Sequence, residues 1–161
     1  PPDPDLGDQE PNPVVNAGWF FDFPNADEYE GERVIKDVNI RDNKAFVLSF
    51  IPNSSPCSGG GNSFFYIIDP ATGGRIDTPT MDINGDGKVD NNDLIQIGTD
   101  EEDNPVYASP TGKLNVGMLH APKFIKIKDT LDKVIMSDSS GDIPVEDIKG
   151  ETLGMYYWIE R

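Results

Sequence analysis

The sequence predicts an all-β domain whose strands run as an antiparallel meander. Short apolar stretches follow one another along the chain, and several alternate polar and apolar side chains with the period of two of a half-buried strand. Segments rich in Gly, Pro, Ser and Asn separate these stretches, and no segment has the period of a long helix. Residues 1–13 hold five prolines and are acidic, so the chain divides into a linker or extended arm (1–13) and a β-rich domain (14–161).

Four strands are expected in the first half of the chain. The first is aromatic and alternating, which places Trp19, Phe21 and Phe23 on one face. The third is nearly all apolar, which predicts a central strand buried on both faces. A turn at 41–44, a Ser/Gly/Pro loop and a Gly-rich turn at 70–74 punctuate the series. The four candidates are residues 18–23, 33–40, 45–51 and 63–69.

The second half repeats this rhythm more weakly. The clearest segment reads Lys-Phe-Ile-Lys-Ile-Lys, and the last is aromatic and ends near Trp158. A turn is expected at 137–141. The strand candidates are residues 106–108, 123–128, 133–136 and 152–159.

Residues 82–93 read Asp-Ile-Asn-Gly-Asp-Gly-Lys-Val-Asp-Asn-Asn-Asp, which matches the twelve-residue calcium loop of the EF-hand type. Oxygen-bearing side chains stand at loop positions 1, 3, 5, 9 and 12, namely Asp82, Asn84, Asp86, Asp90 and Asp93. Gly87 takes position 6, where the loop turns sharply, and Lys88 takes position 7, which supplies its backbone carbonyl. The expected Ca²⁺ ligands are therefore the five oxygen-bearing side chains and the backbone carbonyl of Lys88. Magnesium is disfavoured because it rarely uses such an all-protein cage.

The loop departs from the EF-hand pattern at its two ends. Position 12 is Asp rather than Glu, as in dockerin-type loops. Pro79 precedes the loop, so no entering helix is expected, whereas a short exiting helix is expected from Asn92 to Ile97 with Gly98 as its stop. The alternative is an acidic, solvated turn without a metal. Residues 138–142 imitate the start of such a loop, but Ile143 and Lys149 stand where Gly and an acid are needed, so a second site is rejected.

Composition restricts the classes of partner. The chain carries 29 acidic and 13 basic residues, a net charge of −16, which argues against nucleic acid and anionic membrane surfaces and fits a calcium-rich extracellular setting. No run approaches the roughly 18 apolar residues of a membrane span, so membrane insertion is not expected. No signal segment opens the chain and it begins at Pro1, which suggests a mature product or an excised piece.

No constellation of residues points to catalysis. Gly-x-Ser-x-Gly, a phosphate-binding loop and a pair of His residues are all missing from the sequence, so the chain is not expected to be an enzyme. His120 stands alone and is interpreted as structural. Cys57 is the one cysteine; it is either a free thiol or pairs with a cysteine outside this sequence.

An ordered set of short motifs runs through the first half: Gly18-Trp19 with Asp22, residues 31–34, residues 50–52, Cys57 with Gly60-Gly61 and Ser63, and Asp69 with residues 72–74. This set resembles the C-terminal region of PilY-type adhesins of the type IV pilus tip, from about Gly18 onward. The resemblance implies a β-propeller of four-stranded blades. At roughly 40–50 residues a blade, this chain can make about three blades at most, so a partial or small propeller-like structure is expected. Either the chain is a fragment, or it folds as a smaller β-sheet domain, or another chain supplies the missing blades.

The resemblance implies a calcium-binding extracellular adhesion or assembly module of a type IV pilus tip or surface filament, with the loop residues from Asp82 to Asp93 as its regulatory ion site. The ion is expected to order the loop between strands. Open sheet edges would pair with protein partners such as pilus subunits, other copies of the chain or a host surface. The alternative is a dockerin-like docking module of an extracellular complex, although dockerins carry two loops on helices.

Overall fold

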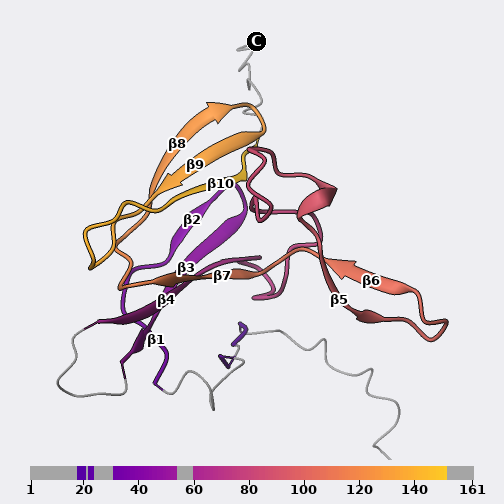
Figure 1. The fold of residues 1–161 in the computed structure, drawn as a ribbon, viewed down its shortest axis with the longest axis horizontal. Helices are drawn as coiled ribbons and strands as arrows, with labels where there is room; N and C mark the ends of the chain where they lie inside the picture. The colour runs from indigo at the N-terminus through magenta and orange to yellow at the C-terminus, as the bar shows by residue number, and fades with distance from the viewer. Residues whose placement is uncertain (1–17, 21, 24–30, 54–59, 152–161) are drawn as a thin grey trace, which may run out of the picture.

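A computed structural model describes residues 18–20, 22–23, 31–53 and 60–151 (Figure 1). The described part is all-β, with every strand pair antiparallel and one 3-10 helix of three residues, η1 (Asn91–Asp93). The largest sheet has the order β1-β3-β4-β7, with β2 also paired to β3; its strands are β1 (Arg33–Val34), β2 (Asn39–Arg41), β3 (Lys44–Pro52), β4 (Gly61–Ile68) and β7 (Gly112–Val116).

Two smaller sheets complete the described structure. A three-stranded meander has the order β10-β9-β8, formed by β8 (Lys123–Lys128), β9 (Leu131–Ile135) and β10 (Val145–Lys149). A two-stranded hairpin is formed by β5 (Ile95–Thr99) and β6 (Pro105–Ala108). The expected all-β, antiparallel class is therefore confirmed.

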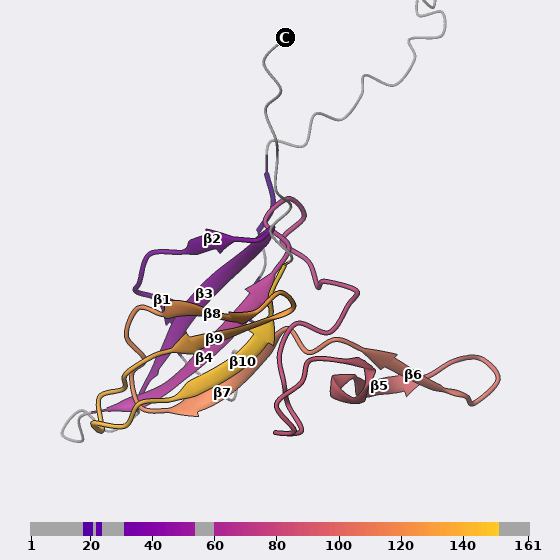
Figure 2. The same ribbon diagram turned by 90° about the horizontal axis from the view of Figure 1, so that it is seen from above.

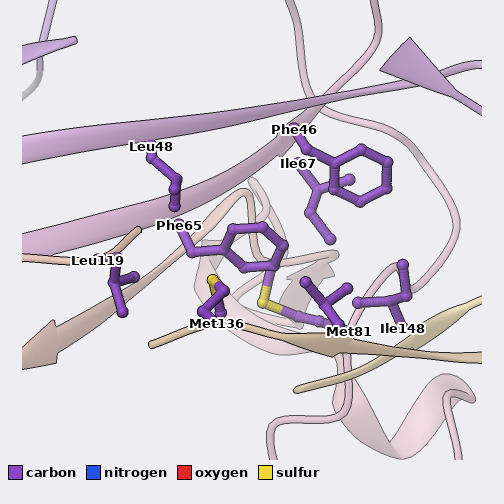
Figure 3. Close-up of a cluster of buried hydrophobic side chains, with 9 residues drawn as sticks. Phe46, Leu48, Phe65, Ile67, Met81, Leu119, Met136 and Ile148 are labelled. Carbon is purple, nitrogen blue, oxygen red and sulfur yellow. The ribbon is translucent and has the colours of Figure 1, made fainter. Parts of the chain in front are cut away.

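The meander packs against one face of the large sheet (Figure 2). Phe46 and Phe65 point from the large sheet toward Met136 and Ile148 on the other side of the interface (Figure 3). Fully burying one such apolar side chain stabilises the fold by about 1.5–3 kcal/mol. The buried side chains of this main core are Phe46, Leu48, Phe65, Ile67, Met81, Leu119, Val134, Met136 and Ile148.

Two ion pairs also join these layers. Arg41 Nη2 on β2 lies 2.6 Å from Asp132 Oδ2 on β9, and the Arg41 guanidinium stands 5.5 Å from the centre of the Phe124 ring. Lys113 Nζ on β7 lies 2.6 Å from Glu146 Oε2 on β10. Both carboxylates are buried, so each requires its basic partner from the opposite sheet.

Strand β3 is buried on both faces, as its apolar sequence predicts. Phe46 and Leu48 enter the main core, whereas Ala45 and Val47 enter a second cluster with Tyr66 and Ile68. The Phe23 ring stacks on Tyr66 in this second cluster, at a centroid distance of 6.0 Å.

The predicted turns at 41–44 and 70–74 are both present. Asp42 and Asn43 have φ values of 50° and 53°, the left-handed pair that a two-residue hairpin requires between β2 and β3. After β4, Asp69 Oδ1 accepts the backbone N–H groups of Ala71 and Thr72, at 2.7 and 3.2 Å. Local side-chain acceptors of this kind are what turn sequences supply.

The β5–β6 hairpin projects from the packed sheets in both views (Figures 1 and 2). Every residue of β5 is exposed, and in β6 only Ala108 is buried. Within the described structure, these two strands contact each other and no other strand. The hairpin is therefore an arm of the domain rather than part of its core.

Three expectations about local structure are wrong. The helix at 92–97 is replaced by η1 and strand β5, because Ile95 and Ile97 belong to a hairpin with β6. The described residues of 18–23 form no strand; Trp19 instead donates from Nε1 to the carbonyl of Pro70 at 2.9 Å. The strand expected at 33–40 is divided into β1 and β2.

The propeller-like architecture is not confirmed. The described strands form sheets of five, three and two strands rather than repeated four-stranded blades. Strands β7 and β10 were not expected from the sequence, whereas β4, β6, β8 and β9 lie close to their predicted positions. The strand expected at 152–159 and the N-terminal linker or extended segment expected at 1–13 lie outside the described residues. In the described part of the chain, no helix has the length and apolar character needed to cross a membrane.

Candidate metal centre

The acidic loop 82–93 begins at the edge of the meander. Met81 forms a bridge with Ile148 of β10, and its side chain is buried in the main core. The Asp82 N–H donates to the carbonyl of Asp147 at 2.9 Å, and the Lys149 N–H donates to the carbonyl of Thr80 at 2.9 Å. The first residue of the loop is therefore held by the backbone of a core strand.

Asp82, at loop position 1, turns its carboxylate into the loop. Its Oδ1 accepts the Gly85 N–H at 2.6 Å and its Oδ2 accepts the Gly87 N–H at 2.8 Å. Gly85 and Gly87 have φ values of 77° and 78°, a left-handed conformation that glycine adopts without a steric penalty. The sharp turn expected at Gly87 is therefore present.

Asp93, at position 12, joins the two ends of the loop and is fully buried. Its Oδ1 accepts the N–H groups of Ile83 and Asn84 at 3.0 and 3.4 Å, and its Oδ2 accepts the Asp90 N–H at 2.9 Å. Asp90 Oδ1 accepts the Asn92 N–H at 2.8 Å, which completes a reciprocal capping box on η1. The shorter acid at position 12 thus reaches both the second and the ninth loop residues.

The middle of the loop faces solvent. Asn84, Asp86 and Lys88 are exposed, and Asp90 is half-buried. Asn84 Oδ1 accepts the Asp86 N–H at 2.9 Å, and Asp86 Oδ1 accepts the Lys88 N–H at 2.8 Å. Each of these two side chains thus accepts from the backbone two residues further on, a local hydrogen bond that is formed at the surface of the loop.

These oxygens are not gathered into a compact cluster. Among the described residues, no group of three or more His, Cys, Asp or Glu side chains is arranged to hold an ion. The structure brings Asp82 and Asp93 inward onto the loop backbone and leaves Asn84 and Asp86 on the outside. A ligand set would require the exposed side chains to turn inward.

The donor chemistry nevertheless fits a hard cation. Asp82 and Asp93 are 7% and 0% exposed, and neither forms an ion pair with a described Lys or Arg side chain. Buried carboxylates are usually paired with a basic group or bound to a metal. Of the other buried acids, Asp132 and Glu146 have basic partners, whereas Asp138 lies in a tight turn and accepts hydrogen bonds from Ser140 and Asp142. The two loop acids differ from Asp138 in that they lie in one loop together with further oxygen side chains.

Sequence reasoning missed how the loop is attached to the fold. Val89, at position 8, is buried, and Met81 anchors the residue before the loop in the core. Their apolar character within an acidic stretch was the available signal. On the other side, η1 leads through Leu94 directly into β5, so the loop connects the meander to the projecting hairpin.

The remaining candidate positions contribute no further ligands to this loop. The His120 side chain is exposed, and its backbone N–H donates to the carbonyl of Ser137 at 2.8 Å. The turn expected at 137–141 is present: Asp138 Oδ1 accepts from the N–H of Ser140 at 2.8 Å and of Asp142 at 3.0 Å. Hydrogen bonds, above all the one from the Ser140 hydroxyl, lower the Asp138 pKa. Cys57 lies outside the described residues.

Fold and loop together define an all-β domain that carries an acidic twelve-residue loop between the packed sheets and a projecting hairpin. Part of the chain is similar to the "Type IV pilus biogenesis factor PilY1" of Pseudomonas aeruginosa. The identity is 32% over 74 residues, 46% of the chain, in strains PAO1 and PAK, and 30% over 77 residues, 48% of the chain, in strain UCBPP-PA14.

The resemblance to PilY-type proteins is therefore confirmed over about half of the chain. The matched region spans only 6–7% of the length of these relatives. No protein-family model matches the chain. No solved structure matches it either.

Proposed function

We propose that this chain is a calcium-binding module of a type IV pilus-associated protein and acts outside the cell in adhesion or assembly. One observation carries the calcium part of the proposal. Asp82 and Asp93 are buried without a basic partner in the described structure, inside a loop that presents three further oxygen side chains. The pilus part is supported by the similarity to proteins named as type IV pilus biogenesis factors.

The ion would be held by the side chains of Asp82, Asn84, Asp86, Asp90 and Asp93 and by the carbonyl of Lys88. When bound, it neutralises the repulsion among the four carboxylates. Asp82 and Asp93 need little movement because backbone N–H groups already direct them into the loop. Asn84 and Asp86 would turn inward from solvent.

Binding of the ion would order the loop and would not supply a catalytic group. One end of the loop is hydrogen-bonded to β10 and the other end continues into β5. An ion that ties positions 1 and 12 to the middle of the loop would therefore fix the hairpin relative to the packed sheets. Protein partners, such as pilus subunits, other copies of the chain or a host surface, would then meet a hairpin of defined orientation. No catalytic role is proposed.

A dockerin-like docking role is less well supported. The loop is flanked by a bridge to β10 and by strand β5, and the described residues around it contain only the 3-10 helix η1. Dockerin-type loops are followed by longer helices. The β-rich surroundings therefore favour a strand-ordering role for the ion.

Asp86→Asn is the variant that tests the ion site. It removes one ligand charge but retains an oxygen that can accept the Lys88 N–H. At a free calcium concentration a few hundred times Kd, bound calcium would stabilise the wild-type fold by roughly 3–4 kcal/mol, which raises the Tm by about 10 °C. Asp86→Asn is expected to weaken calcium affinity by about tenfold or more and to leave the Tm in chelator unchanged. Calorimetric titration and thermal unfolding measure the two effects.

Asp77→Asn is the matched control, because Asp77 is also exposed and lies outside the loop. It should retain the full calcium response. Asp93→Ala is less informative, since it leaves three backbone N–H groups without their acceptor and would destabilise the fold even in chelator. Absence of calcium heat in the wild type, or equal loss of affinity in both Asn variants, contradicts the proposal.

A further inference from the structure

The projecting hairpin has the features of an unpaired docking element. It is a two-stranded sheet with two open edges, and within the described structure it contacts no other strand. A lone hairpin is marginally stable and tends to find further strands or an apolar surface to cover it. Its apolar side chains are largely exposed: Ile95, Ile97, Val106 and Tyr107 are 42%, 52%, 37% and 55% exposed.

The hairpin also combines apolar strands with a strongly acidic tip. Ile95 pairs with Ala108, and Val106 lies two residues before Ala108, so these three side chains share one face. Four acids follow one another in the connecting turn, from Asp100 to Asp103. Hydrogen bonds from the backbone and side chain of Asn104, and from the Glu102 N–H, lower the Asp100 pKa and keep it ionised. Residues 95–108 contain no basic side chain.

A surface of the opposite character lies along β8, the edge strand of the meander. Its outward-facing Ile125 and Ile127 are 46% and 45% exposed. Lys123 and Lys128 stand at its two ends; both are exposed, and neither forms an ion pair among the described residues. In a chain of net charge −16, an exposed strand with unpaired lysines at both ends is a local exception.

We propose that the β5–β6 hairpin of one copy docks on the β8 edge of a second copy. The acidic turn would meet the lysine at one end of β8, Lys123 or Lys128 according to the direction of pairing, and the hairpin's isoleucines would cover Ile125 and Ile127. The hairpin and β8 lie on different sides of the molecule in both views and do not contact each other within one copy (Figures 1 and 2). The contact is therefore intermolecular.

Charge determines which edges pair. Lysines at an edge oppose β8–β8 pairing, and the acidic turn opposes hairpin–hairpin pairing, because like charges directly opposite each other are destabilising. Hairpin–β8 pairing alone brings opposite charges together. Such a heterologous contact uses different surfaces on the two copies, so one copy retains a free β8 and the other retains a free hairpin, and a row of copies can grow.

The contact is expected to be weak in dilute solution. Two short strands bury less than the roughly 1,200 Å² of a stable complex, and two copies of net charge −16 repel each other at long range. At about 0.15 M salt the Debye length is about 8 Å, which screens the net repulsion more than the close contacts. Self-association should therefore be sought at protein concentrations from about 100 µM to about 1 mM.

Complementary charge reversals test the pairing directly. Glu101→Lys/Glu102→Lys takes the charge of the turn 100–103 from −4 to 0 and places two lysines at its tip, and Lys123→Glu/Lys128→Glu makes the β8 edge acidic. Sedimentation velocity on the full chain in chelator is expected to show concentration-dependent association of the wild type and at least a fivefold loss in each variant alone. An equimolar mixture of the two variants should associate again, because the introduced lysines of one variant then meet the introduced glutamates of the other, and the unchanged acidic turn meets the unchanged lysines.

Controls with the same change in net charge separate local pairing from general repulsion. Asp37→Lys/Asp77→Lys matches the hairpin variant, Lys36→Glu/Arg75→Glu matches the β8 variant, and these positions lie outside both surfaces. At about 0.15 M salt, which screens the change in net charge, both controls should associate like the wild type. The proposal is overturned if the wild type stays monomeric up to about 1 mM, or if the mixture does not regain association. A monomeric wild type would indicate that the hairpin binds a different protein. The test is run in chelator, so its outcome is independent of the ion site.

Discussion

At the scale of single residues, Gly73 shows how close contact and backbone conformation combine to require glycine. Its φ is +69°, and a Cβ built there would lie 2.2 Å from the Trp19 ring. Trp19 in turn donates to the Pro70 carbonyl, so the ring closes over the turn after β4. The Gly-rich turn could be predicted from the sequence. The aromatic cover could not, because it depends on a residue more than fifty positions away.

Gly73→Ala is expected to destabilise the fold by more than the left-handed conformation alone requires. The backbone penalty is roughly 1–2 kcal/mol, and displacement of the Trp19 ring adds to it. Gly141→Ala is the control, since Gly141 has a φ of +97° and a Cβ added there would meet no atom within 4 Å. Urea unfolding of both variants measures the difference. Equal free energies of unfolding would show that the Trp19 contact contributes nothing.

At the scale of elements, the two strands that have no counterpart among the expected segments, β7 and β10, carry charge at inward positions. Glu146 of β10 is buried and paired with Lys113 of β7. A polar residue at an inward position conceals the alternation by which a strand is recognised. β3 could be predicted because both of its faces are apolar. The helix expected after the acidic loop failed because Ile95 and Ile97 belong to a hairpin instead, which only the tertiary structure decides.

The acidic turn of the hairpin should depend on pH through Asp100. The backbone and side-chain hydrogen bonds of Asn104, together with the Glu102 N–H, hold its pKa below the usual 3.8. A lowered pKa means that the turn is stabilised above about pH 3.8 and loses this stabilisation as the pH falls through the lower, folded-state pKa. Asn104→Ala removes the side-chain donor and retains the backbone donor, so the Asp100 pKa should rise part of the way. NMR titration of the carboxyl group measures it, and an unchanged pKa would contradict the assigned cause.

At the scale of the whole molecule, the acidic loop joins a packed body to a hairpin that has few contacts with it. The packed sheets share a core that includes Met81, just before the loop, whereas the hairpin after η1 contacts no other strand in the described structure. The ligand pattern of the loop was evident in the sequence, because EF-hand-type loops are local in the chain. Its position at the base of an arm was not, because that position depends on how β10 pairs with residues 80–82.

If the ion orders the loop, calcium should change hydrogen exchange unevenly across the molecule. Amides of residues 82–93 and of β5 should gain protection when calcium replaces chelator, because the ion fixes the link between β10 and the hairpin. Amides in the middle of β3 and β4 already belong to the buried core and should change only as far as global stability changes. Native-state exchange, read by mass spectrometry at low denaturant, separates these two groups.

In Asp86→Asn at the same calcium concentration, the gain at the loop and hairpin should be largely lost, whereas Asp77→Asn should retain it. Equal protection of core and hairpin would mean that calcium acts on global stability alone, and the loop would then not control the orientation of the arm.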